Sequence, residues 1–165
     1  MDNLGHSEII MFHIVLVQPE IPPNTGNIIR LCANTGIQLH LVKPLGFDMD
    51  DKQLRRAGLD YHEFAQVLVH DNWQAYMQKH GAQHRQFAFT TKGSKSAFEC
   101  AFEPGDTWVF GRETAGLGTD LLQQFEPERR LRIPMRPDQR SLNLSNAAAI
   151  VAFEAWRQHG FVGSV

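Results

Sequence analysis

Short apolar runs alternate with longer amphipathic segments along this chain, and this alternation constrains the fold more than any other feature. Six runs are typical of β-strands, at residues 12–17, 38–42, 66–70, 86–91, 107–110 and 130–134. Segments with helical character lie between or after them, at 24–33, 50–58, 73–79, 119–125 and 142–159. Strands that alternate with helices form βαβ units, in which helices cover both faces of a parallel sheet. The pattern therefore predicts an α/β fold with a mostly parallel, six-stranded sheet.

The length of 165 residues fits one domain. We assign residues 1–10 to an N-terminal extension, ordered or disordered, and residues 11–165 to a single domain. No apolar run approaches the ~18 residues of a transmembrane helix, and no signal-peptide pattern opens the chain. The two cysteines, Cys32 and Cys100, form no CxxC pair and fit buried thiols in a reducing compartment. We therefore expect a cytoplasmic protein.

The formal net charge of −2 disfavours a globally basic nucleic-acid-binding protein. Cations nevertheless gather locally, because five arginines and only one aspartate lie between residues 129 and 140. Smaller clusters are Lys52 with Arg55 and Arg56, and Lys92 with Lys95. Arginine suits phosphate groups and stacked bases, although each cluster alone fits a solvated surface equally well. Only local patches could therefore support contact with RNA.

Several familiar motifs are absent from the sequence. No GxGxxG follows the first strand, and Leu117 and Gly118 stand where a Walker A motif needs Lys and Ser or Thr. A zincin motif would need histidine at position 66, where the chain has Gln66. No GxSxG elbow is present. His80 and His84 have the spacing of two zinc ligands but no cysteine pair nearby, so we predict no metal site.

The first of three unusually polar segments is NTGNIIR at residues 24–30, directly after the first strand. Asn24 is expected to cap the following helix. Backbone N–H groups at a helix start attract anionic groups, and Arg30 projects from the same helix face as Gly26 and Asn27. A capped helix with a solvated arginine explains this segment equally well.

The second segment is FGRETAGLG at residues 110–118, where a strand runs into a glycine-rich loop with one carboxylate, Glu113. Glycine permits close approach of a ligand to the backbone, so a ligand loop is favoured over a flexible connection. The third segment, at 133–149, places Ser141, Asn143, Ser145 and Asn146 before or within the first turn of the last helix. Four small polar residues are more than helix capping requires.

Together the three segments resemble the signature motifs of the SPOUT superfamily of RNA methyltransferases, and most closely its small single-domain branch that 2′-O-methylates the tRNA wobble nucleotide. The similarity runs from about residue 11 to residue 163 and includes PEIPPNTGNIIR (19–30), LRRAGLDYH (54–62) and RSLNLSNA (140–147). Arg112 departs from the family pattern, which usually has proline there. The resemblance implies a deep trefoil knot in the C-terminal part of the fold, and a homodimer.

The resemblance also implies S-adenosyl-L-methionine as the cofactor. The implied cofactor-binding residues are Phe89, Thr90, Gly111, Glu113, Gly116, Ile133, Ser141 and Leu142, with Glu113 either facing the cofactor or fixing the loop. The implied catalytic residues are Arg30, Ser141 and Asn143. Arg30 would orient the ribose or a phosphate, because a guanidinium is too basic to accept a proton. The implied RNA-binding residues are Asn24, Arg55, Arg56, Lys92, Arg136 and Arg140.

The function implied by the resemblance is methyl transfer to the ribose 2′-hydroxyl of the wobble pyrimidine in the tRNA anticodon stem-loop, without a metal or a covalent intermediate. Two alternatives remain open: ribose methylation of another RNA, and a non-catalytic RNA-binding dimer of the same fold. The short chain favours tRNA, because many relatives that act on larger RNAs carry an added RNA-binding domain.

Overall fold

The computed structural model describes residues 11–165, so the predicted extension at 1–10 lies outside the described residues. All strands are parallel and form one sheet in the order β3-β2-β1-β6-β4-β7-β5. The strands are β1 His13–Val17, β2 Gln38–Val42, β3 Leu68–His70, β4 Gln86–Phe89, β5 Lys95–Ser96, β6 Thr107–Phe110 and β7 Arg130–Arg132. The predicted α/β class and parallel sheet are confirmed.

The prediction of six strands is wrong, because the sheet has seven. The missed strand is β5, which has only two residues, Lys95 and Ser96, in a polar segment without an apolar run. It pairs with β7 on the side opposite β4. Pairing with a distant segment therefore makes β5 a strand, and no local pattern could reveal it.

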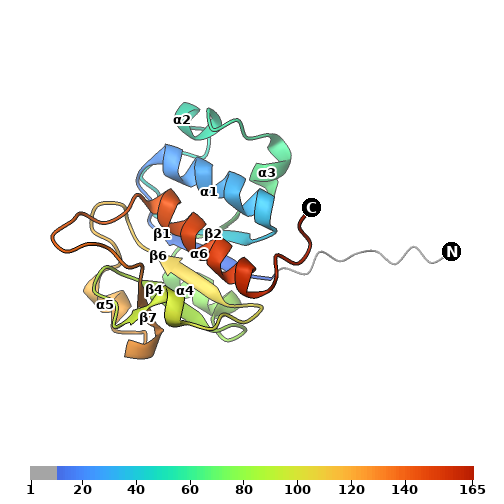
Figure 1. Cartoon of the computed structure of the whole chain (residues 1–165). Helices are drawn as coiled ribbons and strands as arrows, with labels where there is room; N and C mark the ends of the chain where they lie inside the picture. Colours follow the sequence, from blue (N-terminus) through green and yellow to red (C-terminus); the bar gives the residue numbers. More distant parts are fainter. Residues whose placement is uncertain (1–10) are drawn as a thin grey trace.

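Helices cover both faces of the sheet, as predicted (Figure 1). The helical segments are α1 Pro22–Thr35, α2 Lys52–Arg55, α3 Tyr61–Ala65, α4 Trp73–Tyr76, the π-helical turn η1 Met77–Gly81, η2 Ala97–Glu99, α5 Thr119–Leu122, η3 Pro127–Arg129 and α6 Leu144–Gln158. Within β1, Ile14 and Leu16 join the core under α1 and α6, whereas Val15 and Val17 join the core under α4 and α5. The alternation of side chains along a strand divides one apolar run between two cores.

Helix α1 begins earlier than we predicted, and Asn24 is not its cap. The helix starts at Pro22 after Ile21, with prolines at its first two positions and no side-chain cap. Proline suits these positions because its fixed φ is helical and its missing N–H would have no partner there. Asn24 therefore lies inside the first turn, where its side chain is free to bond elsewhere.

The connection from β4 to β5 crosses β7, which lies between these two strands. Residues 90–94 make this crossing, and Gly93 lies against the β7 backbone. A Cβ on Gly93 would lie 2.4 Å from the carbonyl carbon of Leu131, so no other residue fits. The backbone N–H of Thr90 donates to Leu131 O at 2.9 Å. This close crossing fixes the ends of β4 and β7, where Thr90 and Ile133 are expected to contact the cofactor.

No helix in the described part of the chain is long and apolar enough to cross a membrane. Cys32 and Cys100 are both free and buried, as predicted. Burial raises the pKa of both thiols, which keeps them protonated and unreactive at neutral pH.

Candidate functional site

The second motif forms a tight loop at the carboxyl end of β6. Arg112 and Gly116 exchange two backbone hydrogen bonds, at 3.2 Å and 2.8 Å, which close the loop. Gly111 lies under this closure, and a Cβ there would meet the carbonyl carbon of Gly116 at 2.1 Å. Gly116 has a positive φ of 64°, which glycine adopts without steric cost. The loop therefore requires both glycines for its shape.

Glu113 projects from this loop to the start of α1. One carboxylate oxygen accepts a hydrogen bond from the backbone N–H of Glu20 at 2.9 Å, and the other accepts from the N–H of Ile21. A carboxylate at this end of a helix also interacts favourably with the helix dipole. Thr114 adds a bond to the Glu20 carboxylate at 2.9 Å. Of the two roles that the sequence left open for Glu113, this geometry favours fixing the loop.

The third motif is joined to the first through two asparagines. Asn143 caps α6, and its Oδ1 accepts hydrogen bonds from the backbone N–H groups of Ser145 at 2.9 Å and Asn146 at 3.3 Å. Its Nδ2 donates to Asn24 Oδ1 at 3.0 Å. The amide nitrogen of Asn24 lies 3.5 Å from Glu113 Oε2 and donates to it. One buried side chain, Asn24, therefore contacts the other two motifs.

The predicted cofactor-binding residues on the sheet lie at the ends of adjacent strands. Thr90 follows β4, Gly111 follows β6 and Ile133 follows β7, and these strands are neighbours in the sheet. Phe89, the last residue of β4, stacks on Phe110 with ring centroids 4.8 Å apart. In open α/β sheets, ligands bind outside the carboxyl ends of the strands. The structure therefore brings these positions to one edge.

The same residues fit an adenosine-containing cofactor. At Gly111 the backbone is bare, since the loop leaves no room for a Cβ. Phe89 is buried and Ile133 is half-buried, at the ends of the neighbouring strands β4 and β7. Ser141 and Leu142 are exposed and lie three and two residues, respectively, before α6 begins. Such surroundings suit a flat heterocycle read by backbone hydrogen bonds.

Arg30 lies on α1 but does not contact the third motif within the described residues of one copy. Its Nη2 donates to the carbonyl oxygen of Gly58, and its Nε lies 3.5 Å from Glu63 Oε2. The Arg30 side chain is 43% exposed. Gly26, one turn earlier on α1, explains the close packing of α2, because a Cβ there would lie 2.9 Å from Ala57 Cβ. Gly58 and Glu63 therefore hold the Arg30 side chain at the surface.

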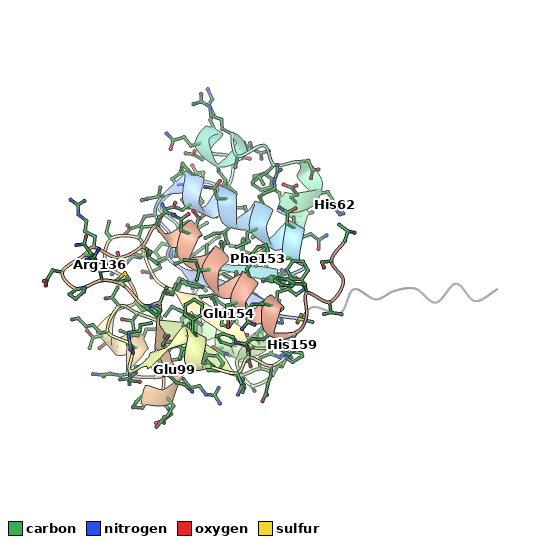
Figure 2. The ribbon with its side chains drawn as sticks, viewed as in Figure 1. His62, Glu99, Arg136, Phe153, Glu154 and His159 are labelled. Carbon is green, nitrogen blue, oxygen red and sulfur yellow. The ribbon has the colours of Figure 1, made fainter. Side chains whose placement is uncertain are left out.

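The arginines between 129 and 140 divide into two groups. Arg130 and Arg132 donate to backbone carbonyls, and Arg129 lies 4.9 Å over the ring of Phe87. Arg136 and Arg140 are exposed and line an open cavity of about 610 Å³ formed by the loop before α6. Figure 2 shows Arg136 at the edge of the molecule on this loop. The second group is therefore the more accessible to a ligand.

The other predicted RNA-binding residues differ in exposure. Arg55, Arg56 and Lys92 are all exposed, and Arg55 pairs with Asp50 at 2.9 Å and lies over the ring of Phe64. Asn24 is only 6% exposed, and both ends of its amide are used inside the protein. This burial argues against direct contact of Asn24 with RNA and gives it a positioning role.

Sequence reasoning missed a second polar cluster, made of histidines under α4 and η1. His13, His40 and His70 come from three adjacent strands and are buried, with His80 from η1 beside them. Burial and the neighbouring histidines lower the pKa of His40 to about 2 and that of His13 to about 4. The spacing of His80 and His84 hinted at this cluster, but the other members are 10 or more residues away.

Comparison with known proteins gives consistent matches over nearly the whole chain. The SpoU rRNA Methylase family matches residues 11–153. A "tRNA (cytidine(34)-2'-O)-methyltransferase" of Methylovorus glucosotrophus is 63% identical over 155 residues, which cover 94% of this chain and 100% of that protein. A solved structure described as "Structural insights into the 2-OH methylation of C/U34 on tRNA" is 42% identical with a TM-score of 0.85 and covers 92% of this chain and 97% of that one. An AdoMet-bound rRNA methyltransferase from Sinorhizobium meliloti is 26% identical with a TM-score of 0.76, covering 89% of this chain and 56% of that one.

Proposed function

Because the chain belongs to the SpoU rRNA methylase family, we propose that it transfers a methyl group from S-adenosylmethionine to the ribose 2′-hydroxyl of the wobble pyrimidine of tRNA. The observation that carries this proposal is the 63% identity to a tRNA (cytidine(34)-2'-O)-methyltransferase over that protein's whole length. The site agrees with it, since Asn24 joins the three motifs into one polar centre. Glu113 also binds the backbone of Glu20 and Ile21 and so adds a second link between the second motif and the first.

Residues at the ends of β4, β6 and β7 would hold the cofactor. Gly111 and Ile133 would offer backbone groups for the adenine, with Thr90 beside them at the end of β4, and Gly116 gives the loop its shape. Ser141 and Leu142 would close the pocket from the loop before α6. S-adenosylmethionine, when bound, supplies an electrophilic methyl group on a sulfonium. The protein then has to place the ribose oxygen in line with that methyl group and exclude water.

Arg30 would orient the ribose or the adjacent phosphate. A 2′-hydroxyl is a poor nucleophile at neutral pH, so its position and the charge that develops on it control the rate. The Gly58 carbonyl accepts a hydrogen bond from the Arg30 guanidinium and fixes its direction. Ser141 and Asn143 would support the ribose or the methionine end of the cofactor. Asn143 has little freedom for this task because it also caps α6.

A homodimer would bring Arg30 of one copy to the third motif of the other. Helices α1 and α6 pack side by side (Figure 1). Phe153 on α6 is 46% exposed, and Phe161 and Val162 just after α6 are exposed too. Exposed aromatic side chains on one helix are typical of an interface between copies. Dimerisation through α6 would bury them and join the basic loops of two chains.

We also infer that the chain is knotted. The support is the crossing of residues 90–94 over β7, with β4 on one side of that strand and β5 on the other. After β7 the chain returns across the molecule to α6, which packs on α1. A knot would hold the cofactor-binding loops together without a disulfide. Knots are rare exceptions among protein topologies.

RNA contact would come from exposed cations around the site, namely Arg55, Arg56, Lys92, Arg136 and Arg140. Arg136 and Arg140 are the best placed, because they flank the loop that carries Ser141. Such contacts are electrostatic, so RNA binding should weaken as salt rises. Since tRNA is the substrate, the protein would work in the cytoplasm.

Two assays on the same preparation test the proposal. Calorimetry measures S-adenosylmethionine binding, and mass spectrometry identifies the nucleoside formed in unmodified bulk tRNA. We expect cofactor binding and 2′-O-methylated cytidine or uridine. Methylation of a base, or no binding of the cofactor, would contradict the proposal. Cofactor and RNA binding without transfer to tRNA would favour another RNA substrate or a non-catalytic dimer.

A further inference from the structure

Five of the eight histidines of the chain gather on the face of the sheet that α4 and η1 cover. His40 lies in β2, opposite Val15 of β1, and His70 ends β3, opposite Val42 of β2. Residues paired across a parallel sheet share a face, so both histidines project into the core that contains Val15 and Val42. His40 is fully buried and His70 is 7% exposed.

His80 completes the group from a different element. It lies in the π-helical turn η1, and its ring centroid is 4.8 Å from that of His40 and 5.3 Å from that of His70. One ring nitrogen from each of these three histidines lies within 4.8 Å of the others. π-Helical turns are rare and occur frequently at functional sites. His80 is only half-buried, which leaves an entry path for a small ligand.

The hydrogen bonds of His40 prepare it to bind a cation. Its Nδ1 lies 3.0 Å from His70 Nε2, and its Nε2 lies 3.0 Å from His13 Nδ1. A neutral imidazole has one donor and one acceptor nitrogen. When Nε2–H donates to His13, the lone pair of His40 Nδ1 faces His70. Metal-bound histidines almost always donate their second nitrogen to such an acceptor.

We propose that His40, His70 and His80 form a binding site for a divalent transition metal, and that the ion that fits best is Zn²⁺. Imidazole nitrogens are preferred zinc ligands, with Zn–N near 2.1 Å and a tetrahedral arrangement. Such ligands lie about 3.4 Å apart. His40 Nδ1 and His70 Nε2, now 3.0 Å apart, would therefore separate slightly, and the half-buried His80 ring would rotate inward. Three protein ligands leave the fourth position to water.

Burial favours the protonation state that a metal requires. Desolvation lowers the pKa of all three histidines, so they are neutral and carry a free lone pair at neutral pH. The ring of Tyr76 packs edge-on against His40 and His70, with centroids 5.3 Å away in each case. This aromatic wall restricts the rings and excludes water from one side.

The site is separate from the methyl-transfer motifs, which lie on other elements. Its metal would join β2, β3 and η1, which are distant in sequence, and so act as a structural cross-link. Binding to the folded state alone stabilises a protein by mass action. At a free Zn²⁺ concentration of 100 times Kd, the midpoint of thermal unfolding should rise by about 5–10 °C. This inference does not depend on the proposed methyl transfer.

The test is a zinc titration of chelator-treated, untagged protein against a chromophoric competitor. We expect one Zn²⁺ per chain and the thermal shift above, with both lost in His70→Gln and His80→Gln. His62→Gln is the matched control, because His62 is exposed on α3 away from the cluster (Figure 2). No binding by the wild-type protein, or equal binding by His80→Gln, would overturn the proposal.

X-ray absorption at the zinc edge on wild-type protein covers the case in which the variants do not fold. We expect three imidazole ligands with Zn–N of about 2.0–2.1 Å. A spectrum with fewer than three imidazoles, or with sulfur from Cys32 or Cys100, would exclude this site.

Discussion

At the scale of single residues, the three motifs of the candidate site are held together by side chains that hydrogen-bond to one another. Asn24 uses its carbonyl oxygen for Asn143 and its amide nitrogen for Glu113. Each partner in turn orders the start of a helix, because Glu113 binds the backbone before α1 and Asn143 caps α6. Positioning of the motifs and stability of the helices therefore rest on the same hydrogen bonds.

Arg30 gives the sharpest prediction at this scale. Arg30→Ala should lower the rate of methyl transfer by about 100-fold, the usual effect of removing one group that stabilises developing charge. Arg30→Lys should recover part of the rate, because lysine keeps the charge but loses the planar fork. Calorimetry should show unchanged S-adenosylmethionine binding in both variants.

Lys43→Ala is the control for Arg30, because it removes another exposed cation that pairs with a carboxylate, outside both the proposed site and the proposed interface. It should transfer methyl groups at the wild-type rate. Full activity of Arg30→Ala would remove Arg30 from the reaction.

Substitutions of Glu113 test whether its carboxylate fixes the loop after β6 to the start of α1. Glu113→Ala leaves the N–H groups of Glu20 and Ile21 without their acceptor, so urea unfolding should show a loss of about 1–3 kcal/mol. Glu113→Gln should lose less, because its amide oxygen can still accept one bond. Glu128→Gln, at an exposed site, should leave the free energy of unfolding unchanged. Wild-type stability with weaker cofactor binding would instead make Glu113 a cofactor ligand.

At the scale of elements, the strands with apolar runs were predictable and the elements made by distant contacts were not. The run from Phe12 to Val17 identifies β1, because a strand buried on both faces is apolar throughout. β5 has no such run and exists only beside β7. The predicted start of α1 was wrong because asparagine is common at helix caps. In the structure Asn24 instead lies inside the first turn and hydrogen-bonds to other motifs. The three motifs were visible in the sequence, but the contacts that join them were not.

The loop after β6 should not tolerate a side chain at Gly111. Gly111→Ala places a Cβ 2.1 Å from the Gly116 backbone, which should cost about 1–3 kcal/mol of folding free energy through overpacking. The affinity for S-adenosylmethionine should fall as well, because the added Cβ would push the Gly116 backbone away and open the loop. Gly118→Ala is a matched control, since no atom lies within 4 Å of its added Cβ and its φ is −66°. Equal cofactor affinity in both variants would contradict this role of the loop.

At the scale of the whole molecule, we propose a dimer, because Arg30 does not contact the third motif within the described residues of one copy. Phe153 lies on the outward face of α6 (Figure 2). Phe153→Glu places a charge in the proposed interface, so light scattering should give the 18.7 kDa of a single chain and methyl transfer should be lost. Phe98→Glu alters an equally exposed phenylalanine on η2 and should stay dimeric. A wild-type monomer with full activity would refute the shared site.

The most direct test of the central claim uses two anticodon stem-loop substrates that differ by one oxygen atom. One carries cytidine at position 34 and the other carries 2′-deoxycytidine there, and methyl incorporation is measured with labelled S-adenosylmethionine. Methyl transfer to the 2′-hydroxyl predicts labelling of the first substrate and none of the second, with equal binding of both. Equal labelling of the two would place the methyl group elsewhere on the RNA and contradict the account.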